Sequence, residues 1–446
     1  MKRITAFILI VLMAVSILGG CTTTTGTKST DPTTAATAST DSAAPSKKVE
    51  IRFSWWGSEL RNEATLKAIE AYQTKNPGVT VVPEYMGYQG YQEKLYALIA
   101  AGTAPDIFTS VTEWYPSLIS SDAMADMTNA FDMSGHSEAY VNACSYEGKV
   151  YGVSTSLNAY GIVYNKALAD KYGIKIPEDK YTWDDLSAIW KEVTEKSNGA
   201  VCGVMDPRYA GWALEAFGYT YLSRPEPYMY DNEGLTCTAE DVAAFIDYFA
   251  NLPKGCVLPA DVSFTVEPQT AAPVAQGKVL MELESTGTFA TMQSQTTDEL
   301  GLIPYPLGPN GETANYARPG LIQNVYSGSK VKEDVFKFLD WFTNAEDAAL
   351  ILTTVRGVLP TVKQREAVMK VDGLLTRNDM VVIDCINKIT ASPMHAFLPG
   401  PLGLDEARMT TFKNVVSEAV FGKISSKEAG IKYIEEANKV FDSYKK

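Results

Sequence analysis

The sequence FSWWGSE, residues 53–59, decides how the rest of the chain is interpreted. It ends the first apolar run after a long polar lead, and its two tryptophans are followed by a glycine, a small polar residue and a carboxylate. This pattern predicts a strand that runs into a tight turn and leaves polar groups at its carboxyl end. In open α/β sheets, ligands bind outside the carboxyl ends of strands. For either tryptophan alone the core is the simpler expectation; alternation puts Trp55 on the strand face of Ile51 and Phe53 and Trp56 on the other face, where the strand ends.

Apolar runs and amphipathic helices alternate on the C-terminal side of this stretch. The first strands and helices expected are 50–55, 60–75, 79–85, 91–101 and 106–109. This strand–helix–strand order predicts a mostly parallel sheet that is covered on both faces. Residues 166–277 are expected to be mainly helical, with helices that begin at the TWDD (182–185) and TAED (238–241) motifs. The C-terminal part is helical again, and Ser425 is expected to cap the last helix. The pattern indicates an α/β fold without internal repeats.

Composition and charge exclude several classes of protein. Hydrophobic residues make up 46% of the 446 positions and charged residues 21%, as in a globular protein with a large core. The net charge of −14 argues against nucleic acid as a partner, because phosphate binding needs a basic surface. The two histidines, His136 and His395, are far apart, so neither a His-rich metal site nor a cofactor is expected.

Residues 1–20 are predicted to be a lipoprotein signal peptide. Lys2 and Arg3 precede a short apolar run, and small residues precede Cys21. In this interpretation Cys21 is lipidated, which would anchor the protein to the extracytoplasmic face of a bacterial cell membrane without spanning it. The alternative is an ordinary signal peptide with an incidental cysteine. Residues 21–48, rich in Thr, Ser and Ala, are expected to form a disordered linker.

An odd number of cysteines follows Cys21, so at least one has no disulfide partner. They are Cys144, Cys202, Cys237, Cys256 and Cys385. Buried free thiols are expected, because Cys is among the most buried residue types. A single disulfide between Cys237 and Cys256 is the alternative.

Eight motifs in a fixed order resemble one protein family. They are FSWWG (53–57), NPGV (76–79), KL (94–95), AGTAPD (101–106), YNK (164–166), TWDD (182–185), GKVLM (277–281) and GVLP (357–360). Each motif is weak alone. Their order behind the leader resembles the family 1 extracellular solute-binding proteins, the carbohydrate-capturing lipoproteins of ATP-binding-cassette importers. The resemblance covers roughly residues 49–446.

The resemblance implies a fold like that of the periplasmic binding proteins, with two discontinuous α/β lobes, a hinge and a ligand cleft between the lobes. Lobe one would comprise residues 49–155 plus 319–357, and lobe two residues 156–318 plus 358–446. The resemblance also implies a monomer without enzymatic activity. Such a protein would deliver a sugar, here expected to be an oligosaccharide, to permease subunits in the membrane.

A sugar presents hydroxyl rims and apolar C–H faces, so its site needs aromatic platforms and planar polar groups. Residues of these types stand at strand ends and at the expected crossings between lobes. The ligand-binding candidates are Trp56, Ser58, Glu59, Tyr88, Gln89, Glu113, Trp114, Asn158, Trp212, Ser285, Arg318 and Arg356. Alanine at Tyr88 or Trp212 is expected to weaken sugar binding and to leave the melting temperature without ligand nearly unchanged.

For the other tryptophans and for the two candidate arginines, a structural role is the alternative to contact with a ligand. Trp183 and Trp190 have helical spacing and are expected in the core, and Trp341 is also expected to pack. Arg318 and Arg356 could form ion pairs between the lobes without touching a ligand.

The rival function is a lipid-anchored extracellular glycoside hydrolase. Such an enzyme needs two carboxylates about 5 Å apart for retention, or roughly 6.5–9.5 Å apart for inversion. Glu59 and Glu113 could supply that pair on paper.

Overall fold

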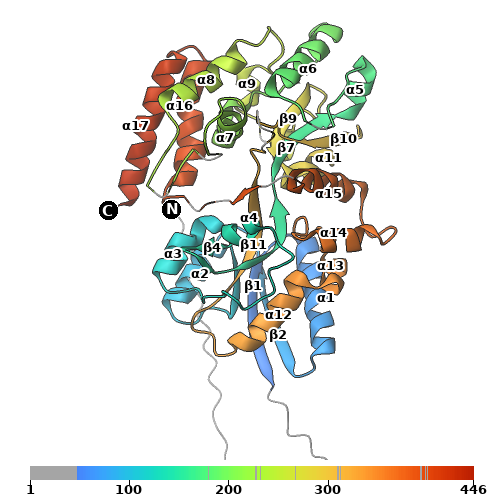
Figure 1. The fold of residues 1–446 in the computed structure, drawn as a ribbon, viewed down its shortest axis with the longest axis vertical. Coiled ribbons are helices and arrows are strands. Elements are labelled where there is room, and N and C mark those ends of the chain that lie inside the picture. Colours follow the sequence, from blue (N-terminus) through green and yellow to red (C-terminus); the bar gives the residue numbers. More distant parts are fainter. Residues whose placement is uncertain are drawn as a thin grey trace, which may run out of the picture. The chain divides into compact units, whose positions relative to one another are not determined.

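The computed structural model describes residues 48–178, 180–226, 229–231, 233–266, 268–308, 311, 313–391, 394–396, 398 and 400–445. The predicted signal peptide, Cys21 and residues 22–47 of the predicted linker lie outside the described residues. The described part belongs to one unit of the chain, residues 47–446. Two sheets, each with its own helices, build this unit (Figure 1).

The first sheet has the strand order β12-β11-β3-β1-β2, and β6 pairs with β11. These strands are β1 (Val49–Trp56), β2 (Val79–Met86), β3 (Ile107–Ser110), β6 (Val153–Asn158), β11 (Tyr316–Val325) and β12 (His395–Ala396). Strand β1 lies parallel to both β2 and β3, as the alternation of strands and helices predicted. The long strand β11 runs antiparallel to β3 and β6.

Alternation along β1 sends its side chains to two different cores. Trp55 is fully buried, as predicted, and Phe53 beside it packs edge-on against Phe338 and Phe342 of a helix that follows β11. Trp56 belongs to a separate cluster on the opposite face. The helices and short turns of this half are α1 (Glu59–Lys75), α2 (Tyr91–Ala100), η1 (Thr112–Trp114), α3 (Tyr115–Ser120), α4 (Glu138–Ala143), α12 (Lys332–Asn344), α13 (Glu346–Leu352) and α14 (Val362–Met369). A two-stranded ribbon of β4 (Ser145–Tyr146) and β5 (Lys149–Val150) accompanies them.

The second sheet has the order β10-β7-β9-β8. Its strands are β7 (Tyr160–Asn165), β8 (Cys202–Val204), β9 (Val279–Ser285) and β10 (Leu300–Pro304). Strands β8 and β9 are parallel, whereas β7 is antiparallel to β9 and β10.

Helices surround the second sheet. They are α5 (Lys166–Tyr172), α6 (Trp183–Lys196), α7 (Gly211–Thr220), α8 (Ala239–Ala250), α9 (Ala260–Ser263), α10 (Pro268–Ala271), α11 (Phe289–Gln293), α15 (Arg377–Thr390), α16 (Phe412–Val420) and α17 (Ser426–Tyr444). Shorter turns are η2 (Pro207–Tyr209), η3 (Thr286–Thr288) and the π-helix η4 (Glu406–Thr411). Reciprocal side-chain and backbone hydrogen bonds cap α6, α8 and α17, which confirms these predicted starts. Trp183 and Trp190 of α6 are fully buried, as predicted.

The two sheets are joined where β6 and β11 pair. Ser156 lies opposite Gly320 and donates a hydrogen bond to its carbonyl oxygen at 2.6 Å. A third segment reaches the same place, because the backbone of Leu157 bridges to Val358. Gly320 and Gly357 allow this approach: a Cβ on Gly320 would lie 2.7 Å from Asn158 Nδ2, and Gly357 has a φ of +113°.

The five described cysteines are free thiols, so the alternative disulfide between Cys237 and Cys256 is not formed. Four of them are buried, as expected, and Cys202 is half-buried. Within the described residues, no group of His, Cys, Asp and Glu could hold a metal ion. No helix in the same residues is both long and apolar enough to cross a membrane.

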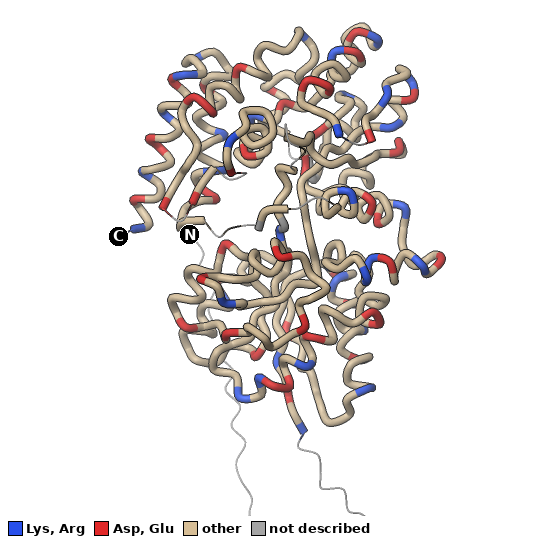
Figure 2. Tube along the Cα trace, in the orientation of Figure 1, with Lys and Arg blue, Asp and Glu red and all other residues tan. Residues whose placement is uncertain are grey.

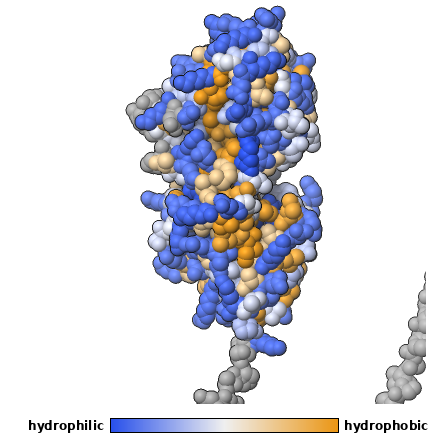
Figure 3. Space-filling view, turned by 90° about the vertical axis from the view of Figure 1, so that its right-hand side faces the viewer, coloured by the Kyte–Doolittle hydropathy of each residue, from blue (hydrophilic) through white to orange (hydrophobic). Residues whose placement is uncertain are grey.

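Charge and hydropathy are distributed differently over the unit. Acidic and basic residues are interspersed over both halves (Figure 2). Apolar residues gather on the face that shows α14 and α15, in both halves and across the waist between them (Figure 3).

Candidate functional site

Two cavities adjoin the crossing strands. The larger has a volume of about 410 Å³, within the range of small-molecule sites. We call it the arginine cavity because Arg61 of α1 and Arg356, which follows α13, both line it. Its other walls come from both halves of the unit: Trp56, Ser156, Asn158, Thr286, Gly287, Ala290, Gly320, Leu321, Thr354, Val355, Gly357, Val358, Asn378, Asp379 and Val382.

Arg356 is only 2% exposed and has no carboxylate partner among the described residues. Its guanidinium donates to Thr155 Oγ1 at 3.2 Å and to Thr65 Oγ1 at 2.9 Å, and it lies over the ring of Phe342. The Nη2 atom has no acceptor. Burial, followed by the charge of Arg61, lowers the pKa of Arg356 to about 9.

Arg61 shares this lack of compensation. Its Nη1 donates to the Trp56 carbonyl oxygen at 3.4 Å, whereas its buried Nε has no acceptor in the described part of the chain. Burial lowers the pKa of the Arg61 guanidinium. The acidic side chain on the cavity wall is Asp379, and its oxygens already accept hydrogen bonds from Thr354 and from the backbone and hydroxyl of Thr376.

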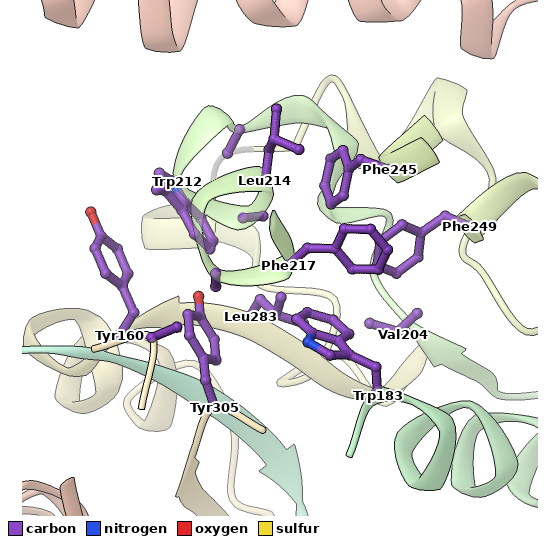
Figure 4. Close-up of a cluster of buried hydrophobic side chains, with 14 of the residues drawn as sticks. Tyr160, Trp183, Val204, Trp212, Leu214, Phe217, Phe245, Phe249, Leu283 and Tyr305 are labelled. Atoms are coloured by element: carbon purple, nitrogen blue, oxygen red, sulfur yellow. The ribbon is translucent and has the colours of Figure 1, made fainter. Parts of the chain in front are cut away.

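The second cavity has a volume of about 340 Å³, and we call it the aromatic cavity. It is lined by Tyr160, Tyr209, Trp212, Glu284, Ser285, Thr288, Arg318, Asp405, Arg408 and Met409. The rings of Tyr160 and Trp212 stack with centroids 5.0 Å apart and an interplanar angle of 11°. Tyr305 stacks on Tyr160 at 6.3 Å, and Figure 4 shows these rings at the edge of the apolar cluster that fills the second half.

Charged groups of the aromatic cavity are compensated within the protein. Arg408 of η4 is 3% exposed and forms an ion pair with the buried Glu215 at 3.4 Å, although its Nε has no acceptor. Burial alone would lower the pKa of Arg408, but Glu215 and Tyr316 raise it well above its ordinary value. Glu284 accepts hydrogen bonds from the Ser285 backbone and the Thr288 hydroxyl, and burial raises its pKa.

Arg318 ties the aromatic cavity to the first sheet. Its Nη2 lies 2.8 Å from Glu113 Oε1, and its Nη1 donates to Tyr160 Oη at 2.7 Å. The pKa of Arg318 is raised by Tyr160 and Glu113, although burial opposes the rise. Arg318 therefore forms an ion pair between the halves, whereas Arg356 forms none among the described residues, and contact of either arginine with a ligand stays a prediction.

A cluster of aromatic rings connects Glu113 with Trp56. Trp56 packs against Trp114 at 5.6 Å, Tyr91 at 5.0 Å and Tyr88 at 5.5 Å. Trp56 and Trp114 are 8% and 7% exposed, whereas Tyr88 is 55% exposed. Trp56 thus belongs to a core and also lines the arginine cavity.

The structure places half of the twelve predicted site residues on the walls of these two cavities. Trp56, Asn158 and Arg356 line the arginine cavity, and Trp212, Ser285 and Arg318 line the aromatic cavity. Glu113 lines neither cavity but forms the ion pair with Arg318. Trp114 and Tyr88 also line neither cavity, and their rings pack against Trp56. The exposed residues Ser58, Glu59 and Gln89 line neither cavity.

Several cavity residues were missed from the sequence. Tyr160 follows the predicted crossing directly, and Glu284 stands in an apolar strand, so both positions carried a visible signal. Arg61 lies in the first turns of a helix after the opening motif, where a solvent-exposed charge was the simpler expectation. Arg408 is about 190 residues away from its partner Glu215, and no local pattern predicts that pairing.

Comparison with known proteins identifies relatives over most of the chain. Residues 67–373 match the sequence profile of a family described as bacterial extracellular solute-binding protein. A Brucella abortus protein described as a binding protein is 26% identical over 308 residues, which are 66% of this chain and 72% of that protein. The multiple sugar-binding protein of Streptococcus mutans is 27% identical over 190 residues, 41% of each chain.

A solved structure shows the same fold. A family 1 extracellular solute-binding protein from Alicyclobacillus acidocaldarius superposes with a TM-score of 0.76 at 23% sequence identity, covering 89% of this chain and 100% of that chain. The predicted two-lobed α/β fold is confirmed by this likeness.

Proposed function

The chain belongs to the bacterial extracellular solute-binding proteins, and from that premise we propose that it captures an oligosaccharide between its two lobes and delivers it to an ATP-binding-cassette importer. It does this work on the extracytoplasmic side of the membrane. The proposal includes a lipid anchor at Cys21, a residue outside the described part of the chain, and action as a monomer.

The observation that carries the proposal is the stacked row of rings at the aromatic cavity. Tyr160 and Trp212 present flat apolar surfaces, and Glu284, Ser285 and Arg318 stand on the same wall. Aromatic faces match the C–H faces of a sugar, and carboxylate, hydroxyl and guanidinium groups match its hydroxyl rims. The sugar-binding relative in Streptococcus mutans supports the same ligand class.

Closure of the two lobes about the segments that connect them would distinguish the ligand-bound protein from the free protein. A ligand that contacts both lobes only when they are closed favours the closed state, because it binds the two states unequally. The arginine cavity has walls from both halves of the unit, so its shape depends on their relative position. The permease would then recognise the closed form.

The experiment is a thermal-shift measurement against a panel of neutral and acidic mono- and oligosaccharides. A ligand that binds only the folded state raises the melting temperature, and several degrees of shift are expected for at least one oligosaccharide. Chromatography after long incubation tests for turnover. Cleavage of the sugar would replace the importer function by the rival hydrolase, and no shift with any sugar would overturn carbohydrate as the ligand.

A further inference from the structure

The arginine cavity contains positive charge that the protein does not neutralise. Arg61 and Arg356 both line it, and neither forms an ion pair with a carboxylate of the described residues. Each has a buried guanidinium nitrogen without an acceptor. Guanidinium groups at this depth are normally paired, because an isolated buried charge is costly.

Other buried arginines of the described residues have either a carboxylate partner or several neutral acceptors, although the Nε atoms of Arg224 and Arg408 also lack an acceptor. The protein has a net charge of −14, so carboxylates are abundant. The buried Arg208 is paired with Asp206 at 2.6 Å, and the buried Arg408 is paired with Glu215. The fully buried Arg365 donates to the Leu359 and Pro360 carbonyl oxygens and to Asn387 Oδ1.

Charge balance in the cavity indicates what is missing. The charged residues among those lining it are Arg61, Arg356 and Asp379, which together leave one net positive charge. Both Asp379 oxygens are occupied at the start of α15. A carboxylate carries one negative charge and accepts paired hydrogen bonds from guanidinium groups, so it would neutralise the cavity.

We propose that the arginine cavity receives a carboxylate of the captured saccharide, so that the ligand contains a uronic acid residue. This inference rests on the proposed function, since it takes the ligand to be a saccharide. The aromatic cavity would hold a neighbouring sugar ring, because Thr286 and Gly287 line one cavity and Ser285 lines the other.

The test uses the folded protein and matched pairs of ligands. Each pair consists of a uronic acid oligomer and the neutral oligomer obtained by reducing its carboxyl groups to primary alcohols. Isothermal titration calorimetry should show binding of at least one acidic oligomer, with its reduced counterpart about 100-fold weaker, as expected for the loss of charge-assisted hydrogen bonds. A sulfated derivative of the neutral oligomer, which carries sulfate in place of carboxylate, provides the comparison with another anion.

Two variants tie the preference to the cavity. Arg61→Gln should weaken binding of the acidic oligomer about tenfold or more and should reduce its advantage over the neutral oligomer. Arg52→Gln is the matched control, because it also removes one arginine charge, but from a half-exposed residue paired with Glu84 outside both cavities. Circular dichroism and the melting temperature verify that each variant is folded.

The outcomes separate this inference from the proposed function. Equal affinity for the acidic and neutral members of every pair, a preference for the sulfated oligomer, or an unchanged preference in Arg61→Gln would overturn the uronic acid while leaving saccharide capture intact. Failure of all saccharides to bind would overturn the proposed function, and the inference would fall with it.

Discussion

The two cavities contain buried arginines in opposite situations. In the aromatic cavity, Arg408 is paired with Glu215, and Arg318 is paired with Glu113. In the arginine cavity, Arg61 and Arg356 share one wall without a carboxylate partner. The same residue type is therefore paired with a carboxylate at one cavity and has no such partner among the described residues at the other.

This difference indicates that the role of a buried arginine depends on whether a carboxylate neutralises its charge, and not on burial alone. A paired guanidinium contributes to the architecture, because removal of its partner leaves an isolated charge. An unpaired guanidinium beside a cavity is a stability cost that a ligand can relieve. Glu215→Leu, Arg356→Met and Glu113→Gln test this distinction.

The largest effect is expected from breaking the compensated pair. Glu215→Leu leaves Arg408 buried with only the exposed Asp405 nearby, so the free energy of unfolding should fall by roughly 3–5 kcal/mol. Arg356→Met loses hydrogen bonds to Thr65 and Thr155 but also removes an unpaired buried charge. Its loss should be about 1 kcal/mol or less. Urea unfolding without ligand measures both variants, and equal losses would contradict the comparison.

The aromatic residues give a second contrast. Trp212 is 7% exposed within the large apolar cluster, so Trp212→Ala should lower the free energy of unfolding by roughly 3–5 kcal/mol. Tyr88 is 55% exposed, and Tyr88→Ala should change it by about 0.5 kcal/mol or less. From the sequence, both were expected to leave the ligand-free protein nearly unchanged, and the burial of Trp212 revises that expectation. Thermal melts of the two variants decide the matter.

Glu282 is a buried carboxyl group without an ion-pair partner among the described residues, so it tests the same distinction for an acidic side chain. Burial, and then Glu284, raise the pKa of Glu282 to about 8, and its Oε1 has no hydrogen-bond partner. The folded state therefore holds this proton more tightly than the unfolded state, so stability is full below about pH 4.5 and is lost as the pH rises toward 8.

Glu282→Gln should remove most of that loss, which is on the order of a few kcal/mol between pH 5 and 8. Urea unfolding at pH 5, 6.5 and 8 measures it. Glu63→Gln, on the exposed face of α1, is the matched control and should keep the slope of the parent protein. If the free energy of unfolding of Glu282→Gln fell with pH as steeply as that of the parent protein, other titrating groups would be the cause.

A small effect is also expected at the ion pair between the halves. The side chains of Arg318 and Glu113 are 32% and 16% exposed, so water screens their attraction. Glu113→Gln should change the free energy of unfolding by about 1 kcal/mol or less, because Arg318 keeps its hydrogen bond to Tyr160. Melting temperatures at low and high salt check this. A loss comparable to that of Glu215→Leu would show that this ion pair stabilises the fold as strongly as the buried Arg408–Glu215 pair does.

Local patterns predicted the fold, but the chemistry of the cavities depends on distant residues. Alternation separated Trp55 from Trp56, and the Thr182 and Ser425 motifs located helix starts, because each signal lies within a few residues. By contrast, Arg356 donates to Thr65 from 291 positions away, and no sequence pattern shows that an acid is missing between them. Ser58 and Glu59 show the limit of an argument from strand ends, because both are exposed and line neither cavity, and their contact with a ligand stays a prediction.

Strand β11 makes the first sheet depend on the last third of the chain. It lies between β3 and β12 and also pairs with β6, and the helix that covers Phe53 follows it in sequence. A ribosome that has synthesised residues 1–315 has therefore produced a chain whose first sheet is open at β3. Such a chain keeps an apolar strand exposed and has no closed lobe. The first sheet can therefore close only after β11 has been synthesised.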